Sequence, residues 1–333
     1  MKTGIKIRNT LITFIMVSLL ALMTVACGQN VNQNTDSGNS QNGTQYGDSQ
    51  SGTAKKEVNN IEGKIRIDGS NTLFPILDAI TKEFNKTFPN IDVHIGVAGT
   101  TGGIRNFMRG KLDIVNASSP FTDVQAEDCK EQGVEYSEFK IAYDGIVIAV
   151  NKDNTWVDSI TVEELQKIWA SDSTAKKWKD INPKWPDADI KLIAPESETQ
   201  FFSEVINGDQ GNIRPDFTQI NDGKALEEAI DGDKNAMGII GYEVYSENSD
   251  TMKVLGVDTG SGAVKPDLST IKGLSYKPLS RPLYLYVNKK SLENESVKEF
   301  INFAYGDGSK LVKEAGFIPL DDYKTELSKL NNR

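Results

Sequence analysis

The chain alternates between short segments with the two-residue repeat of a strand and longer segments with the repeat of a helix. Residues 91–97 alternate apolar side chains with polar or small ones, which indicates a half-buried strand. Residues 76–88 carry an apolar side chain at every fourth position, which predicts a helix with one buried face. That helix begins near Pro75, a residue that the first helical turn tolerates.

The same patterns continue along the rest of the chain. They predict strands at residues 64–68, 112–115, 190–194, 237–240 and 283–287, a helix through residues 107–108, and helices at residues 124–132, 161–169, 199–206, 242–246 and 297–305. Thr161 and Glu164 form a capping box at the start of one helix. The mostly apolar segment 141–150, interrupted at Asp144 and Gly145, is consistent with a crossing between two domains. Because strands and helices alternate throughout, the predicted fold class is α/β.

The N-terminal residues have the pattern of a secretory signal. Basic residues at positions 2, 6 and 8 precede an apolar run at 11–26, and small residues at 24–28 form a cleavage site with Cys27 just after the cut. The apolar run is too short for a membrane span, and the residues that follow it are not those expected after one. Cys27 resembles the lipidated cysteine of a bacterial lipobox, which predicts signal peptide 1–26 and an anchored mature chain. The alternative is a cleaved signal and a freely secreted protein.

The residues after the cleavage site differ in composition from the rest of the chain. Residues 27–60 are rich in Asn, Gln, Ser, Gly and Thr, with few apolar side chains. Such a segment cannot bury enough surface to offset the entropy lost on ordering, so we expect a disordered tether. The residues that follow it are enough for one large domain or two ordinary ones.

Charge and cysteine content exclude several classes of protein. The net charge of −10 argues against a nucleic-acid partner and against a polybasic membrane surface. The chain has only two cysteines, Cys27 and Cys129, so lipidation of the first leaves no internal disulfide and the fold must depend on its core. Cys129 lies in a charged helical stretch without a nearby histidine, and we interpret it as an incidental thiol.

Three turns share a composition suited to binding an anion. In each, a strand runs into small hydroxyl-bearing residues and a helix follows; the three turns are residues 69–73, 99–103 and 196–199. Helix N-termini present unpaired N–H groups and a partial positive charge, hydroxyls add donors, and glycine allows close backbone approach. A single turn of this kind is more often a plain N-cap. Three in one chain indicate a dehydrated oxyanion held mainly by neutral donors.

Motifs in this order and spacing resemble a known family, the phosphate-binding lipoproteins of ABC importers. The motifs are IDGSNTLFP (67–75), AGTTGG (98–103), LDIVNASSP (112–120), AYDGIV (142–147), LQKIW (165–169), IGY (240–242), LSRPLYLYVN (279–288) and GFIPL (316–320). The resemblance implies the two-lobed type II periplasmic-binding-protein fold with two interlobe crossings. Lobe one is then expected at 61–146 plus 275–322, lobe two at 147–274, and a C-terminal tail at 323–333.

The resemblance also implies the residues that bind phosphate. Carried over position by position, they are Ser70, Asn71, Thr72, Leu73, Thr100, Thr101, Gly102, Ser118, Ser197 and Thr199. Well-studied members have an acceptor aspartate in the third element, and a large subgroup has an arginine after Asn-Ala-Ser. This chain has Ser118 and Ser119 there, so both charged groups are absent. In the fourth loop, the family's glycine is replaced by Glu198.

Three charged residues have more than one interpretation. Glu198 could accept the proton of hydrogen phosphate, which sulfate lacks, but we prefer a solvated carboxylate in the first helical turn, favoured there by the helix dipole. Arg105 could reach the anion with two hydrogen bonds or be an ordinary surface arginine. Asp144 is expected at the crossing, where it would orient the cleft, and His94 is expected to be exposed.

Together these features predict a binding protein and not an enzyme. The chain has one histidine and no metal-spaced cluster, nucleophile elbow or Walker loop, so we expect no cofactor and no metal. The implied partners are inorganic phosphate and the permease subunits of an ABC importer. The protein is expected to be a monomer on the extracytoplasmic face of the cell membrane. Its anchor would be the lipid on Cys27, which includes palmitate. The alternatives are a lipoprotein that senses an anion or scaffolds a partner, and a binder of another oxyanion.

Overall fold

The computed structural model describes residues 60–330. The predicted signal peptide, Cys27 and nearly all of the predicted tether therefore lie outside the described residues. Within residues 60–330, no helix combines the length and apolar character needed to cross a membrane.

The first part of the fold is a mixed sheet with the strand order β2-β1-β3-β12-β4. Its strands are β1 (Gly63–Gly69), β2 (Ile91–Ile95), β3 (Ile114–Ala117), β4 (Tyr136–Asn151) and β12 (Ser280–Asn288), with β13 (Ile318–Pro319) paired to β4. β1 is parallel to both β2 and β3, whereas β12 is antiparallel to β3 and β4. The end of the chain thus returns between two strands from its first half.

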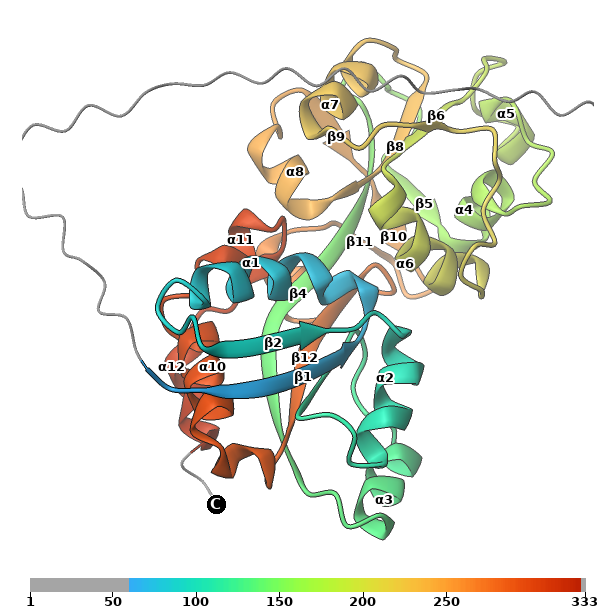
Figure 1. The fold of residues 1–333 in the computed structure, drawn as a ribbon. Helices are drawn as coiled ribbons and strands as arrows, with labels where there is room; N and C mark the ends of the chain where they lie inside the picture. The colour runs from blue at the N-terminus through green and yellow to red at the C-terminus, as the bar shows by residue number, and fades with distance from the viewer. Residues whose placement is uncertain (1–59, 331–333) are drawn as a thin grey trace, which may run out of the picture. The chain divides into compact units, whose positions relative to one another are not determined.

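Helices cover both faces of this sheet. The helices of this part are α1 (Phe74–Phe84), α2 (Gly99–Met108), α3 (Asp123–Glu131), α10 (Glu295–Tyr305), α11 (Leu311–Glu314) and α12 (Tyr323–Leu327), with short 3₁₀ turns η1 (Asn71–Leu73), η2 (Ser291–Glu293) and η3 (Ser328–Leu330). In β12, Leu283 and Leu285 pack with α1 and α10, whereas Tyr284 and Tyr286 pack with α2 and α3. The two-residue repeat of a strand produces this division between faces (Figure 1).

The second part of the fold is built on the C-terminal half of β4. β4 pairs there with β8 (Ala236–Gly241) and β9 (Met252–Val254), and β8 is followed in the sheet by β6 (Lys191–Ala194) and β7 (Thr218–Gln219). A small separate sheet contains β5 (Ser159–Thr161), β10 (Gly256–Asp258) and β11 (Ala263–Val264). The helices are α4 (Val162–Trp169), α5 (Trp178–Ile181), α6 (Glu196–Asn207), α7 (Gly223–Asp231), α8 (Tyr242–Glu247) and α9 (Leu268–Lys272).

The two parts share β4, which changes partner at one point. Gly145 is the last β4 residue paired with β12, opposite Ser280, and Ile146 is the first paired with β8, opposite Gly241. The Ile146 N–H also donates to the Leu279 carbonyl over 2.9 Å, so the returning chain crosses beside β4. Figure 1 shows β4 running as one strand from the first sheet into the second. The predicted α/β class and two-lobed fold are confirmed.

Most predicted elements are present with shifted ends. The capping box at Thr161 and Glu164 is present, with hydrogen bonds of 3.1 and 3.0 Å. His94 is exposed, as expected. The segment expected as a C-terminal tail is instead helical as far as Leu330, and the Tyr323 hydroxyl donates to the Ile141 carbonyl over 2.8 Å. Aromatic and aliphatic side chains in that segment add to the first core, which is why it folds onto the sheet.

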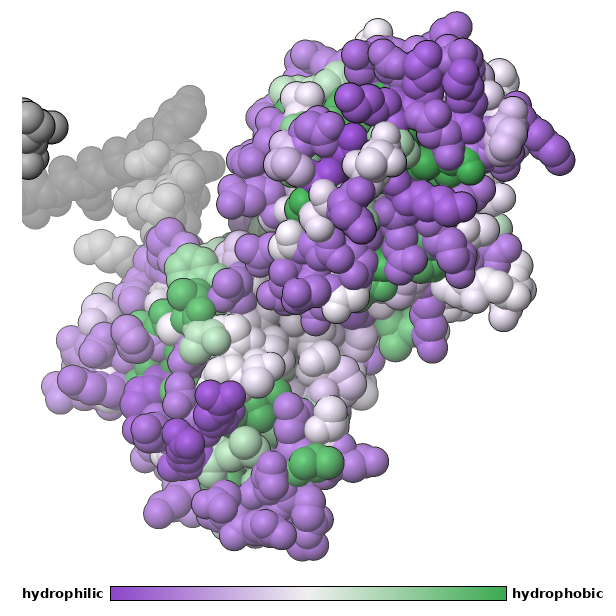
Figure 2. Space-filling view, turned by 90° about the vertical axis from the view of Figure 1, so that its right-hand side faces the viewer, coloured by the Kyte–Doolittle hydropathy of each residue, from purple (hydrophilic) through white to green (hydrophobic). Residues whose placement is uncertain are grey.

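The surface is mainly polar. Figure 2 shows hydrophilic residues over most of the visible face, with smaller apolar groups between them. Among the described residues, the large apolar side chains that are most exposed are Phe74, Val97, Val124 and Leu268. Single exposed apolar residues are normal on protein surfaces and need no special explanation.

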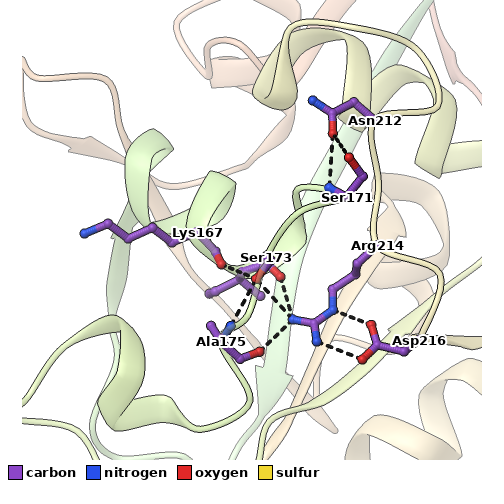
Figure 3. A network of polar contacts seen from close by, with 8 residues as sticks. Lys167, Ser171, Ser173, Ala175, Asn212, Arg214 and Asp216 are labelled. Carbon is purple, nitrogen blue, oxygen red and sulfur yellow. Dashed lines mark hydrogen bonds and ion pairs between the residues drawn. The ribbon is translucent and has the colours of Figure 1, made fainter.

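A buried arginine organises the loops of the second part. Arg214 is 6% exposed, and its Nη1 donates to the carbonyls of Ile168 and Ala175 over 2.9 and 2.7 Å. Its Nε and Nη2 donate to the two carboxylate oxygens of Asp216 over 2.5 and 2.9 Å (Figure 3). The guanidinium therefore supplies partners to loop carbonyls that would otherwise be buried without one.

We predict that Arg214→Met lowers the free energy of unfolding by about 2–3 kcal/mol, because buried carbonyls lose their donors while Asp216 can still reach water. Denaturant unfolding of the variant measures this change. Lys184→Met, at an exposed position, is the control and should change stability by less than about 0.5 kcal/mol. Equal stability of the two variants would contradict a structural role for the arginine.

Candidate functional site

Two adjoining cavities lie where the loops of the two parts meet. The first, of about 560 Å³, is lined by residues 70–72, 98–102 and 118–120 from the first part and by residues 200–201, 204 and 208–210 from the second. The second, of about 810 Å³, is lined by Asp144, by residues 196–198 and by apolar side chains that include Phe74 and Phe317. Five residues line both cavities: Asn71, Thr72, Gln200, Phe201 and Arg281.

The first predicted loop follows the end of β1. Ser70 is buried, its N–H donates to the Asn116 carbonyl over 3.0 Å, and its hydroxyl accepts from the Thr72 N–H over 3.3 Å. Asn71 and Thr72 face the cavities. The Leu73 side chain is instead fully buried in the core, and its N–H donates to the Ser70 carbonyl over 3.3 Å. Of this loop, Leu73 is therefore not brought to the site.

The second loop is held against the first by one carboxylate. Asp68 Oδ1 accepts from the N–H groups of Gly69 and Ala98, each over 2.8 Å. α2 also packs very closely on β1, because a Cβ added to Gly103 would lie 2.5 Å from the Gly69 Cα. A side chain at position 103 would push the helix and its N-terminal loop away from the first loop.

The third element meets the second loop through hydroxyl groups. The Thr100 and Ser118 hydroxyls are 3.1 Å apart, and Thr100 Oγ1 also accepts from the Ser118 N–H over 3.3 Å. Thr101, Gly102 and Ser119 line the same cavity. The structure thus places loops one to three around the first cavity, whose lining from these loops is neutral.

The fourth loop lines the second cavity and not the first. Ser197 and Glu198 lie in the lining of the second cavity, at the start of α6. Thr199 is buried, its hydroxyl donates to the Glu196 carbonyl over 2.7 Å, and it lines neither cavity. In the described structure, Ser197 therefore shares the second cavity with Asn71 and Thr72, whereas neither Ser197 nor Thr199 lines the first cavity with loops two and three.

Glu198 is not the solvated residue that we expected. Its side chain lines the second cavity, accepts a hydrogen bond from the Ser197 hydroxyl, and lies close enough to Gly241 that a Cβ there would be 3.1 Å from Glu198 Oε1. Burial raises the pKa of the Glu198 carboxyl, and the negative charge of Asp144 raises it further, while the bond from Ser197 opposes the shift. The preferred interpretation from sequence is wrong because it ignored the walls that α8 and β4 add around this turn.

Arg281, which contacts Asp144, Thr72 and Phe201, was not among the site residues predicted from the sequence. Its Nε and Nη2 lie 3.0 and 2.9 Å from Asp144 Oδ2, and Nη2 donates to the Thr72 hydroxyl over 3.1 Å. Its guanidinium carbon lies 3.5 Å from the centre of the Phe201 ring. The available signal was an arginine inside the quoted motif LSRPLYLYVN, in an otherwise apolar strand. Asp144 lies at the crossing as predicted, whereas Arg105 is exposed and lines neither cavity.

The chemistry available here is that of binding an anion. The first cavity offers hydroxyls, backbone N–H groups and the Arg281 guanidinium from one side, while Glu204 and Asp209 line it from the second part of the fold. Among the described residues, no group of three or more histidine, cysteine or acidic side chains is arranged to hold a metal ion. Cys129 is buried, and burial raises the pKa of its thiol to about 11, so it is a poor nucleophile at neutral pH.

Comparisons with known proteins also identify similarity to binding proteins. The family model described as "PBP superfamily domain" matches residues 38–307. The chain is 37% identical over 278 residues to the "Phosphate-binding protein PstS" of Staphylococcus saprophyticus, covering 81% of this chain and 85% of the relative. It is 35% identical over 273 residues to the "Protein SphX" of Synechocystis, covering 80% of this chain and 81% of the relative.

Solved structures are similar in fold. The crystal structure of a possible phosphate binding protein from Planctomyces limnophilus superposes with a TM-score of 0.79 and 36% identity, over 82% of this chain and 99% of that one. An ABC-type phosphate transport receptor from Vibrio cholerae, 24% identical, superposes with a TM-score of 0.58 over 77% of this chain and 100% of that one. The chain belongs to the PBP superfamily and, within it, to the family of the phosphate-binding PstS proteins.

Proposed function

We propose that this protein captures inorganic phosphate between its two lobes and delivers it to an ABC importer. The observation that carries the proposal is the meeting of the Thr72, Thr100 and Ser118 hydroxyls with the Arg281 guanidinium around one cavity. Hydroxyl and N–H donors at strand ends and helix starts suit a dehydrated oxyanion. The names of the relatives, phosphate-binding proteins and a phosphate transport receptor, support phosphate as that anion.

The proposed site contains the predicted residues that line the cavities. They are Ser70, Asn71, Thr72, Thr100, Thr101, Gly102, Ser118 and Ser197, with Asp144 and Glu198 beside them. Thr199 is proposed to contribute its backbone N–H at the start of α6, since its hydroxyl is already bonded. The proposed lobes are residues 61–146 plus 275–322 and residues 147–274, a division supported by the change of β4 partner between Gly145 and Ile146.

The same proposal extends to the location of the protein. The lipobox-like Cys27 and the polar segment after it support a monomer tethered by lipid to the extracytoplasmic face of the membrane, with the permease as its protein partner. Binding as the function is supported by the names of the relatives, which are phosphate-binding proteins.

Removal of the site hydroxyls tests the position of the anion. Thr72→Ala and Thr100→Ala should each weaken phosphate binding by about 1–3 kcal/mol, because a polar partner of the buried anion is lost. Isothermal titration of residues 60–333 with phosphate measures the loss. Thr174→Ala, at an exposed position far from both cavities, is the matched control and should leave affinity unchanged. A double alanine variant that binds phosphate as well as the control would show that the site is misplaced.

Glu198 tests the electrostatics of the second cavity. Its charge repels a nearby anion by an amount on the order of 1 kcal/mol at protein-like screening, so Glu198→Gln should tighten phosphate binding. Because the pKa of Glu198 is raised, the carboxyl is neutral at lower pH and becomes charged as the pH rises through that raised value.

The difference in phosphate-binding free energy between the parent and the Glu198→Gln variant should therefore be small at acidic pH and increase as the pH rises. Titrations of both proteins across pH measure this difference, and sulfate, whose charge is constant at these pH values, separates the titration of the carboxyl from that of phosphate. Sulfate, which carries no proton at these pH values, should gain at least as much from the substitution as phosphate. A difference that does not change with pH would mean that the carboxyl does not face the anion. Tighter binding of sulfate together with weaker binding of phosphate would instead assign Glu198 as the proton acceptor.

Phosphate should also draw the lobes together, because the cavity is lined from both sides. Small-angle scattering with and without saturating phosphate should show a smaller radius of gyration for the bound protein. The Thr72→Ala/Thr100→Ala variant at the same phosphate concentration is the control. Scattering curves of the parent that stay the same on adding phosphate would contradict closure.

A further inference from the structure

We propose that Arg281 is the cation that binds the phosphate, with Asp144 as its positioning residue and Phe201 as its contact with lobe two. The inference rests on the proposed phosphate-binding function. It starts from the charge of the site, since Arg281 is the one basic residue among the described residues that line either cavity. The third element offers Ser118 and Ser119 to the first cavity and no basic side chain.

The guanidinium is held in place before any ligand binds. Its side chain is 12% exposed, Nε donates to Asp144 Oδ2 over 3.0 Å, and Nη2 lies 2.9 Å from the same oxygen as an ion pair. No hydrogen bond of Nη1 to a described residue is present, which leaves that nitrogen available to an anion. Arginine suits this role because its planar fork can bond a carboxylate on one edge and a phosphate on another, which the single ammonium of lysine cannot do.

Arg281 also determines which way the Thr72 hydroxyl in the first loop donates its hydrogen. Its Nη2 donates to Thr72 Oγ1 over 3.1 Å, so this oxygen acts as an acceptor toward the arginine. The hydroxyl hydrogen of Thr72 is then free to point toward an anion in the first cavity, which Thr72 also lines. The arginine therefore contributes its own donors and orients a neutral one.

The stack on Phe201 connects this cation to the other lobe. The guanidinium carbon is 3.5 Å from the ring centre, so the ring covers one face and the N–H groups are directed outward in the plane. Phe201 lies in α6, whose first turn carries Ser197 and Glu198. Arg281 lies on β12, just after the returning chain. An anion bound to Arg281 is therefore coupled, through Phe201, to the helix that brings the fourth loop.

The experiment is phosphate titration calorimetry on residues 60–333 with substitutions at positions 281, 144 and 201. Arg281→Met should weaken binding by at least about 30-fold, and Arg281→Lys by about tenfold or more, as expected for lost bonds to a charged group. Arg105→Met removes the same charge from an exposed position outside both cavities and is the matched control. Circular dichroism checks folding, and if the Met variant does not fold, the Lys variant decides the outcome.

A double-mutant cycle separates positioning by Asp144 from a structural role. Asp144→Asn should weaken binding about tenfold in the parent and have little further effect in the Arg281→Met background, because it acts through the arginine. If Asp144 had a purely structural role, Asp144→Asn would weaken phosphate binding by the same factor in both backgrounds. Phe201→Leu should weaken binding several-fold, whereas Phe201→Tyr, which keeps the aromatic face, should bind like the parent.

Two results would overturn the inference. If Arg281→Met binds phosphate within threefold of Arg105→Met, the arginine does not bind the anion, although the proposed phosphate-binding function would still hold. If Asp144→Asn has the same cost with and without Arg281, its assignment as a positioning residue is wrong. A parent protein that bound no phosphate would be a different result, since it would contradict the proposed function itself.

Discussion

The architecture depends on one uninterrupted strand that belongs to two sheets. β4 is sixteen residues long, and its backbone pairs with β12 before Gly145 and with β8 after it. The returning chain crosses next to it at Leu279, so the two crossings are adjacent and bonded to each other. Any loop that ends a strand near this point is close to the other lobe. The cavities lie there because both sheets present loops to the same crossing.

The site combines a rigid set of neutral donors with one oriented charge. Asp68 ties the first two loops together, and Thr100 ties the second loop to Ser118, so these donors are fixed by neighbouring backbone and side chains. Arg281 is fixed by Asp144, a partner that lies beside the crossing on β4. A donor set arranged before binding loses little entropy when the ligand arrives. The surrounding acidity matters less, because exposed charges are screened by salt within about 8–10 Å.

Much of the fold could be predicted because its signals are local. Strand alternation, the capping box at Thr161 and the motifs in sequence order led to the α/β class and the two-lobed fold. The first three loops were assigned to the site through the family resemblance, and in the structure each follows a strand of one sheet. The features that could not be predicted from the sequence depend on contacts that residues make at the crossing between the two lobes. Arg281 gains its meaning only beside Asp144, Thr72 and Phe201, which are distant in sequence, and the same holds for the walls around Glu198.

The second cavity gives a physical reason for the altered fourth loop. A glycine at position 198 would leave the start of α6 open to an anion, whereas the glutamate places a second carboxyl near Asp144. Burial is the main cause of the raised pKa of the Glu198 carboxyl, and the negative charge of Asp144 raises it further. Asp144 is paired with Arg281, whereas the described structure gives Glu198 a hydrogen bond from the Ser197 hydroxyl, which opposes the rise in its pKa. The residue that departs from the expected pattern of the fourth loop is therefore also a carboxyl whose charged form is disfavoured by the cavity around it.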